Sequence, residues 1–311
     1  PLCFANAVKS GKVGIIGASG TGTQELTVLL DSAGCGITHA IGTGGRDLSA
    51  EVAGRTAFAA LELLAKDAPT EIIAIISKPP SKEVADRITE AVKKTGKPCV
   101  LAFLGASAAK ISDRIFIAGT IEEAAAKIGA LCKGNNPDSF NIIYDRKPFG
   151  YHGLDKFKPS QKAVRGLYTG GTLASEAQTV LAGAQAQVID LGDDEYTKGA
   201  LHPMIDPANR SSHIHEAYAD DKVAVILCDV VLGYGSHNDP AGVLAKDVKS
   251  AKEKTNAHKI VIACVVGSDA DPQGKAAQIK ALEEAGIFVF PSNQYAAEIA
   301  AKLAKKLQGV E

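Results

Sequence analysis

The stretch that decides the fold is Lys12-Val-Gly-Ile-Ile16, followed by Gly17-Ala-Ser-Gly-Thr-Gly22. The first part is an apolar run typical of a buried strand, and the second part is a Gly-rich turn. A helical pattern begins directly afterwards, with Leu26, Leu29 and Leu30 on one face. A strand, a Gly-rich turn and a helix in this order indicate the opening unit of a parallel α/β sheet.

The first half of the chain continues this alternation of strands and helices. Further strands are expected at residues 38–41, 71–76, 98–103 and 115–118. Residues 71–76 are almost wholly apolar, as expected of a central strand that helices cover on both faces. Thr120-Ile-Glu-Glu123 has the pattern of a capping box, so the last helix of this half is expected to begin there.

The second half repeats the plan in the same order. Residues 164–168 lead into Thr169-Gly-Gly-Thr172 and a helix from about residue 173, and further strands are expected at 187–191, 223–227, 259–266 and 286–290. The shared order of Gly turn, third apolar strand and final helix indicates a duplication.

Five strands in this pattern fit a flavodoxin-like topology better than a six-stranded dinucleotide fold. The sequence therefore predicts an α/β protein of two tandem flavodoxin-like domains, each a doubly wound parallel sheet. We place these domains at residues 1–134 and 161–311, joined by a linker at 135–160 that is rich in Lys, Pro, Asn and Gly.

Composition excludes several classes of partner. The net charge is −1 over 311 residues, so neither nucleic acid nor an anionic membrane is expected. No apolar run approaches the roughly 18 residues of a membrane helix, and no signal peptide is recognisable. The six cysteines lack metal-ligand spacing and are expected as buried thiols in the reducing cytoplasm, with no metal site.

Two Gly-rich turns are candidate anion sites, because helix N-termini present free backbone amides. The first turn departs from the G-x-G-x-x-G dinucleotide pattern and lacks a Walker lysine. A tight turn without a ligand is its alternative interpretation. The equivalent turn in the second half favours a ligand, and two facing helix N-termini would hold one phosphate or carboxylate. The predicted anion-binding residues are Ser19, Gly20, Thr21, Gly170, Gly171 and Thr172, with charge neutralised by Arg46 and Arg210.

The polar segment 193–210 is the candidate catalytic region. His202 is expected to act as a general acid or base or to carry phosphate transiently, although a histidine that merely hydrogen-bonds its own loop is an open alternative. Asp206 lies in the same loop, and Asp229 ends the third strand of the second half. Either carboxylate would handle protons together with His202.

At these turns the sequence resembles the succinyl-CoA synthetase superfamily, and most closely the FdrA family of acyl-CoA-synthetase-like proteins. The motifs that carry the resemblance are Gly-Ala-Ser-Gly-Thr-Gly, Ile-Gly-Thr-Gly-Gly-Arg-Asp-Leu, Ser-Lys-Pro-Pro, Gly-Leu-Tyr-Thr-Gly-Gly-Thr-Leu, His-Pro-Met-Ile-Asp-Pro and Asp-Val-Val-Leu-Gly-Tyr-Gly. The first half resembles the ligase domain of the synthetase α subunit, and the second half resembles the carboxy-terminal domain of the β subunit.

The resemblance implies transfer of an activated acyl or carbamoyl group through a phosphate-bearing intermediate. CoA and a nucleotide would enter through domains or partners outside this chain, because the family's upstream CoA-binding domain is expected to be missing from a chain that opens at Pro1. The family's phosphohistidine would lie between Phe103 and Ala118, where this sequence has no histidine.

Two alternatives stay open beside this function. The chain is a subunit of an oxamate carbamoyltransferase of allantoin and purine breakdown, or a non-catalytic assembly subunit with a relic site. In each case we expect a small anionic substrate, and a homo-oligomer or partner subunits.

Overall fold

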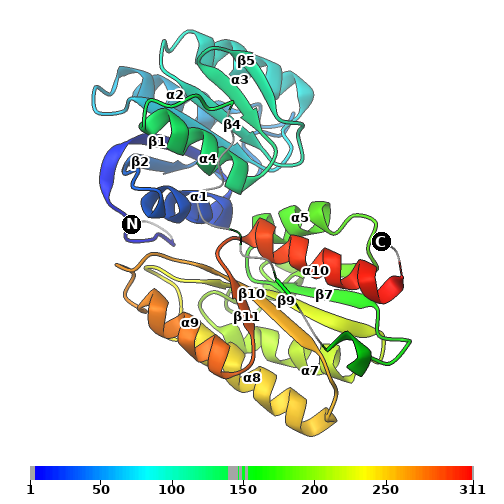
Figure 1. Cartoon of the computed structure of the whole chain (residues 1–311). Coiled ribbons are helices and arrows are strands. Elements are labelled where there is room, and N and C mark those ends of the chain that lie inside the picture. The colour runs from blue at the N-terminus through cyan, green and yellow to red at the C-terminus, as the bar shows by residue number, and fades with distance from the viewer. Residues whose placement is uncertain (1–3, 139–145, 147–148, 151–152, 310–311) are drawn as a thin grey trace. The chain divides into compact units, whose positions relative to one another are not determined.

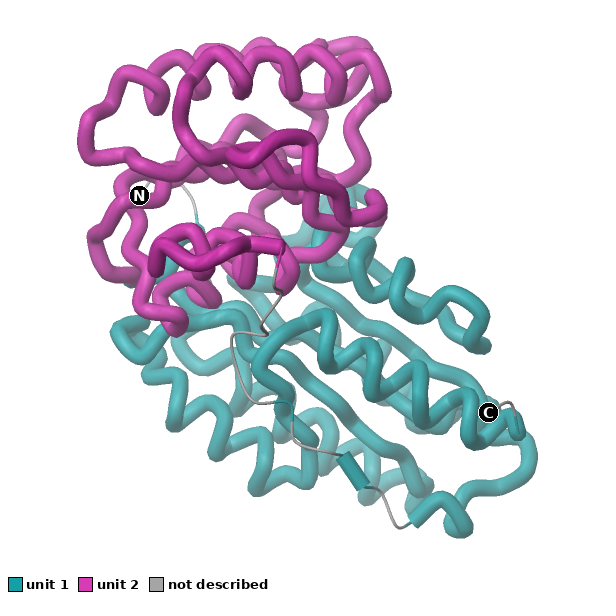
Figure 2. The backbone as a smooth tube through the Cα atoms, turned by 45° about the horizontal axis from the view of Figure 1, so that its top comes forward, with its two compact units in different colours: residues 1–7, 146–311 teal, residues 8–145 magenta. Residues whose placement is uncertain are grey.

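The computed structural model describes residues 4–138, 146, 149–150 and 153–309. The chain forms two compact units, which Figure 2 colours separately. Unit 1 consists of residues 1–7 and 146–311, and unit 2 consists of residues 8–145. The chain thus passes from unit 1 through unit 2 and back into unit 1.

Unit 2 is a doubly wound sheet with the strand order β2-β1-β3-β4-β6-β5 (Figure 1). Only β5 runs antiparallel to its neighbour. The elements of this unit are β1 (Ser10–Ala18), α1 (Gly20–Ser32), β2 (Ile37–Gly42), α2 (Arg55–Lys66), β3 (Ile72–Ser77), α3 (Lys82–Lys93), β4 (Cys99–Phe103), β5 (Ala109–Ser112), β6 (Ile115–Ala118) and α4 (Ile121–Cys132).

The core of unit 2 lies on both faces of its sheet. All six residues of β3 are buried, because helices cover this central strand on each side. On one face, Ile73 and Ile75 of β3 pack in a cluster with Leu61 of α2 and Val84 of α3. The helices α1 and α4 pack against one another and also contact the strands.

Unit 1 repeats this architecture with the strand order β11-β10-β9-β7-β8, all parallel. Here α5 packs against α10, while α7, α8 and α9 form a second group. The elements are η1 (Leu154–Lys156), β7 (Ala163–Tyr168), α5 (Gly171–Val180), β8 (Ala186–Asp190), α6 (Asp194–Thr197), η2 (Pro207–Arg210), α7 (Ser211–Ala219), β9 (Val223–Val231), α8 (Pro240–Thr255), β10 (Ile260–Val266), α9 (Lys275–Glu284), β11 (Phe288–Phe290) and α10 (Asn293–Gln308).

The predicted fold class is confirmed: both sheets have the flavodoxin-like order, to which unit 2 adds β5 at its edge. The predicted capping box is also present, since Thr120 Oγ1 accepts a hydrogen bond from Glu123 N at 3.1 Å. The carboxylate of Glu123 reaches one residue further back than expected, to Gly119 N at 2.9 Å. The predicted linker at 135–160 lies partly outside the described residues.

Residues 4–7 lie against unit 1 at the carboxyl ends of its strands. Ala5 forms an antiparallel bridge with Tyr234, with Tyr234 N donating to Ala5 O at 2.7 Å. Asn6 Nδ2 donates to Leu232 O at 3.0 Å, and Ala7 N donates to Asp271 Oδ1 at 2.7 Å. Residues 4–7 are therefore part of the unit that is otherwise built from the second half of the chain.

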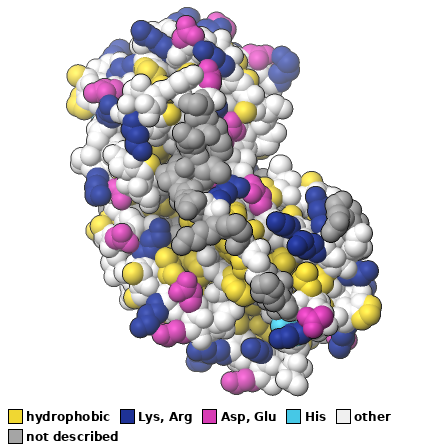
Figure 3. Space-filling model, viewed as in Figure 1, with side chains coloured by type: hydrophobic (Ala, Val, Ile, Leu, Met, Phe, Trp, Pro, Cys, Tyr) yellow, Lys and Arg dark blue, Asp and Glu magenta, His cyan; other side chains and the backbone are white. Residues whose placement is uncertain are grey.

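The surface in Figure 3 carries basic and acidic side chains interspersed with one another, in keeping with the small net charge. Among the described residues, no helix combines the length and the apolar character that a membrane crossing requires. Cys35, Cys99, Cys228 and Cys264 are buried free thiols, as predicted, whereas Cys132 is half-buried. Cys3 lies outside the described residues.

Candidate functional site

The edge where the strands end is the expected ligand site in each unit. In unit 2, β1 leads to β2 on one side of it and the chain then returns to β3 on the other side. This reversal opens a crevice beyond the carboxyl ends of β1 and β3, where open α/β sheets bind ligands. In unit 1 the equivalent reversal lies between β7 and β9.

The turn between β1 and α1 in unit 2 is held open by its own hydrogen bonds. Ser19 is the N-cap of α1, and its hydroxyl accepts from Gly22 N at 3.1 Å. Thr23 Oγ1 donates to Ser19 O at 2.5 Å. Gly20 is exposed, and a methyl group built on it would meet no atom within 4 Å. The positive end of the α1 dipole therefore faces free space, which suits an anion.

Two exposed cations stand at this edge of unit 2. Arg46 lies in the turn after β2, as predicted, and Lys78 follows directly after β3. The neighbouring Asp47 adds no negative charge to the crevice opening, because it is buried and accepts from Thr56 N and Ala57 N at the start of α2. Lys78 was not among the predicted site residues, although its position directly after the most apolar strand indicates this edge of the sheet.

The equivalent turn in unit 1 is already occupied by a side chain of the protein. The Asp229 carboxylate accepts hydrogen bonds from Thr169 N at 2.7 Å, from Thr169 Oγ1 at 3.1 Å and from Gly170 N at 2.9 Å. Asp229 thus takes the place of an anion at the amide of Gly170, which the sequence assigned to a ligand, and at the neighbouring amide of Thr169. Gly171 and Thr172 begin α5 just beyond them.

Arg210 completes this arrangement from inside unit 1. Its Nη1 donates to Asp229 O at 2.7 Å and lies 3.4 Å from Asp229 Oδ1. Asp229 has no exposed surface and Arg210 is 2% exposed. Burial raises the pKa of Asp229, and the Arg210 charge together with the Thr169 and Gly170 hydrogen bonds opposes that rise. The geometry is that of a buried structural ion pair.

His202 lies at the same edge of unit 1, half-buried beside Phe4, whose ring centroid is 5.6 Å from that of His202. Its Nδ1 accepts from Met204 N at 3.2 Å, so a neutral His202 ring carries its proton on Nε2. A methyl group built on Gly192 would lie 2.8 Å from His202 Nε2 and 3.2 Å from Asp190 Oδ1. Burial lowers the pKa of His202, and Asp190 partly offsets this.

Asp206 is exposed and serves as the N-cap of η2, where its carboxylate accepts from Ala208 N at 3.1 Å. The structure thus brings His202, Arg210 and Asp229 to one edge of unit 1, and Ser19, Gly20, Thr21 and Arg46 to one edge of unit 2. Within the described ranges, no cluster of three or more His, Cys, Asp or Glu side chains has metal-binding geometry.

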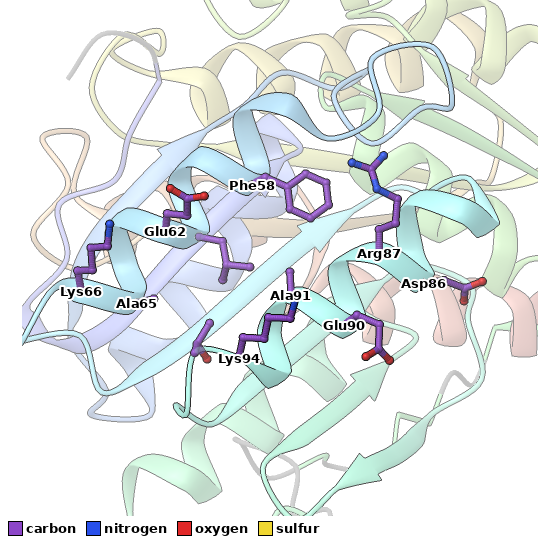
Figure 4. A pocket seen from close by; sticks show the side chains of 11 residues that line it. Phe58, Glu62, Ala65, Lys66, Asp86, Arg87, Glu90, Ala91 and Lys94 are labelled. Atoms are coloured by element: carbon purple, nitrogen blue, oxygen red, sulfur yellow. The ribbon is translucent and has the colours of Figure 1, made fainter.

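A groove of about 660 Å³ lies between α2 and α3 of unit 2 (Figure 4). Its floor includes Phe58 and Leu61, and its lining carries three acidic and three basic side chains. The Arg87 guanidinium lies 4.9 Å from the centroid of the Phe58 ring. The groove lies on the outer side of two packed helices and carries none of the predicted site residues.

Comparison with known families assigns a domain type to each unit. Residues 8–105 match the CoA binding domain family, and residues 167–303 match the CoA-ligase family. The CoA-binding match falls within residues 1–134, where the sequence analysis expected an α-subunit ligase domain and placed CoA binding outside this chain. The matches support the succinyl-CoA synthetase-like superfamily.

The protein YahF of Escherichia coli (strain K12) is 37% identical to the chain over 320 residues. The alignment covers 94% of this chain and 62% of YahF, so the chain spans less than two thirds of this relative.

Two solved structures show a more distant similarity. PH0766 from Pyrococcus horikoshii OT3 has a TM-score of 0.36 and 17% identity, covering 98% of this chain and 67% of that one. The dinucleotide-forming acetyl-coenzyme A synthetase 1 of Ca. Korarchaeum cryptofilum, solved with phosphate and ADP, has a TM-score of 0.34 and 15% identity, covering 97% and 66%. At such low TM-scores the similarity says nothing about the site.

Proposed function

We propose that the chain is a component of a CoA-ligase-type enzyme that binds the phosphate groups of CoA at the carboxyl edge of unit 2. It would take part in transferring an activated acyl or carbamoyl group through a phosphate-bearing intermediate. The observation that carries this proposal is the open turn at Gly20, at the crevice between β1 and β3 of a unit that matches the CoA binding domain family.

The residues at this edge fit a phosphate-bearing cofactor. The turn at Gly20 and Thr21 would offer backbone amides at the positive end of α1, and Ser19 keeps the turn in place by capping Gly22 N. Lys78 and Arg46 would neutralise phosphate charge. When bound, CoA supplies a thiol that carries acyl groups as thioesters.

In unit 1, a neutral His202 would donate a hydrogen bond to a bound group. Because Nδ1 accepts from Met204 N, the proton of the neutral ring lies on Nε2. Hydrogen-bond donation from Nε2 is favoured over phosphate transfer to it, because the proton occupies its lone pair; general acid catalysis would need the protonated ring. We keep Asp206 as the proposed partner of His202 in proton transfer. Asp229 is not available for this role, because it is hydrogen-bonded to Thr169 and Gly170 and paired with Arg210.

The second candidate function is a non-catalytic assembly subunit, with catalysis on a partner chain. The observation in its favour is the occupied turn of unit 1, where Asp229 fills two amides that a ligand would need. Carbamoyl transfer involving oxamate remains a variant of the enzyme function, because carbamoyl phosphate is also a small anion.

Titration calorimetry of the whole chain with CoA tests the proposal. We expect binding of about one CoA per chain, at the open turn of the unit that matches the CoA binding domain family. Gly20→Asp places a carboxylate in the free space before α1, where it suits the helix dipole but repels phosphate, so binding should fall at least about tenfold, a cost of roughly 1.4 kcal/mol. Gly20→Ala is the matched control and should bind like the unmodified chain.

Equal CoA affinity in the Gly20→Asp and Gly20→Ala variants would refute the site. No binding of CoA, inorganic phosphate or carbamoyl phosphate by the unmodified chain would favour the assembly subunit. Carbamoyl phosphate binding without CoA binding would favour the carbamoyltransferase variant.

A further inference from the structure

We propose that Phe4 is a positioning residue for His202: its apolar ring fills the space beside the imidazole and keeps the Nε2–H group in one orientation. The inference rests on the proposed function, in which His202 donates a hydrogen bond to a bound group from that atom. It is carried by residues 4–7, which lie far from His202 in the sequence but beside it in the fold.

One buried carboxylate holds residues 4–7 on unit 1. Asp271, which is 4% exposed, accepts hydrogen bonds from Asn6 Nδ2 and from Ala7 N, each at 2.7 Å. Asn6 Nδ2 also donates to Leu232 O at 3.0 Å, and the Ser268 hydroxyl donates to Ala7 O. Hydrogen bonds to a charged carboxylate are stronger than those between neutral groups, so this segment is held firmly in place.

The backbone bridge at Ala5 brings the side chain of Phe4 beside His202. Ala5 and Tyr234 exchange both backbone hydrogen bonds of this antiparallel bridge, at distances of 2.7 and 3.3 Å. A methyl group built on Gly235 would lie 3.1 Å from a carbon atom of the Phe4 ring, so this ring packs on the loop after β9. Its centroid lies 5.6 Å from that of the His202 ring, and the two ring planes meet at 42°. The imidazole is thus flanked by a side chain that its own loop does not supply.

The loop of His202 itself supplies one hydrogen bond to the ring. Nδ1 accepts from Met204 N at 3.2 Å, which sets the tautomer of the neutral ring. Nε2 lies close to Gly192, where an added methyl group would be 2.8 Å away. One hydrogen bond at this length restrains the ring only weakly. Truncation of Phe4 would leave a cavity beside the imidazole, into which the ring can turn or water can enter.

Burial and charge act on His202 in opposite directions. Burial is the larger effect and lowers the pKa of His202, whereas Asp190, the charged group at the end of β8 that acts on the ring, raises it. Phe4 adds to the burial of the imidazole and carries no charge. Its removal should therefore let water reach the ring and raise the pKa of His202 toward 6.5.

The test is nuclear magnetic resonance of the whole chain with isotope-labelled histidine, which reports the pKa of each imidazole and the nitrogen that carries its proton. In Phe4→Ala, we expect the pKa of His202 to rise toward 6.5 and the neutral ring to become a mixture of both tautomers. Phe4→Leu keeps an apolar side chain and should behave like the unmodified chain. Asn6→Ala removes two hydrogen bonds that hold residues 4–7 and should shift the pKa of His202 in the same direction as Phe4→Ala.

Phe157→Ala is the matched control. Phe157 lies beside His258 in the same unit, with ring centroids 4.7 Å apart. This substitution should leave the titration of His202 unchanged. The proposal is overturned if Phe4→Ala does not raise the pKa of His202, or if the neutral ring keeps its proton on Nε2 alone. It is equally overturned if Phe4→Leu behaves like Phe4→Ala.

Calorimetry with CoA separates this inference from the proposed function. The open turn at Gly20 lies in unit 2, so Phe4→Ala should bind CoA like the unmodified chain. If the unmodified chain binds no CoA, the proposed CoA site fails, while the titration of His202 still decides the role of Phe4.

Discussion

The buried carboxylate of Asp229 binds backbone amides of a Gly-rich turn, where a bound anion would otherwise bind. This carboxylate accepts hydrogen bonds from two backbone N–H groups and one hydroxyl just before α5, and the Arg210 guanidinium balances its charge. A helix N-terminus favours an anion whether that anion is a ligand or a side chain. The turn of unit 1 is therefore an anion site with an internal anion, whereas the turn of unit 2 is open.

Removing the charge of Asp229 should destabilise unit 1 strongly. Asp229→Asn leaves the Arg210 guanidinium buried without its counter-charge, which costs about 3–5 kcal/mol. Urea unfolding followed by circular dichroism measures this loss. As a control, Asp206→Asn removes an exposed carboxylate and should change stability by less than about 1 kcal/mol. A similarly small loss for Asp229→Asn would contradict the structural role of the pair.

His202 should make stability depend on pH. Its pKa in the folded chain lies below the ordinary value of 6.5, because burial disfavours the charged ring. The unfolded chain then binds more protons between these two values, so stability rises with pH through this window and is lost as pH falls below about 6.5.

We therefore expect the unmodified chain to lose more stability than His202→Gln between about pH 7 and pH 5. The measurement is the difference between the two proteins' free energies of unfolding at each pH. Taking this difference cancels the contribution of His258, whose pKa is also lowered by burial. Parallel pH profiles would show that His202 titrates alike in the folded and unfolded chains.

At the scale of elements, the turn between β1 and α1 contains two glycines that differ in the space available for a side chain. A methyl group on Gly17 would lie 2.0 Å from Thr23 Oγ1, whereas one on Gly20 would meet nothing within 4 Å. We expect Gly17→Ala to cost about 1–3 kcal/mol, because Thr23 must give up its hydrogen bond to Ser19 O. Gly20→Ala should be neutral or slightly stabilising. Thermal unfolding compares the two, and equal Tm values would argue against this turn geometry.

The sequence predicted those elements whose burial leaves a periodic pattern. All ten strands expected from apolar runs are present, whereas β5 was not predicted because it has only four residues and all of them are exposed. The candidate site was harder to predict, since its decisive contacts are not local. No sequence feature near Thr169 predicts that its backbone N–H donates a hydrogen bond to Asp229, which lies 60 residues later. Of the candidate site, the sequence could predict only the Gly-rich turns, because these are formed by consecutive residues.

At the scale of the whole molecule, the two units repeat one architecture but differ at the edge where ligands bind. Unit 2 presents an open helix terminus with Arg46 and Lys78 exposed. In unit 1 the Asp229 carboxylate holds the amides of Thr169 and Gly170 just before α5, and residues 4–7 lie over the loop after β9. The two units thus share one architecture but differ in the side chains that line the carboxyl ends of their strands, where ligands bind.

The path of the chain bears on how the protein is made. Asn6 leaves the ribosome well before its partner Asp271, which is synthesised 265 residues later. At about 5–20 residues per second, this delay is roughly 13–53 s. Unit 2 can fold during this time, whereas residues 4–7 cannot dock, because the part of unit 1 that binds them has not yet been synthesised. The nascent chain therefore exposes Phe4–Ala7 while unit 2 and most of unit 1 are synthesised, and these residues can dock only after the segment around Asp271 has been made.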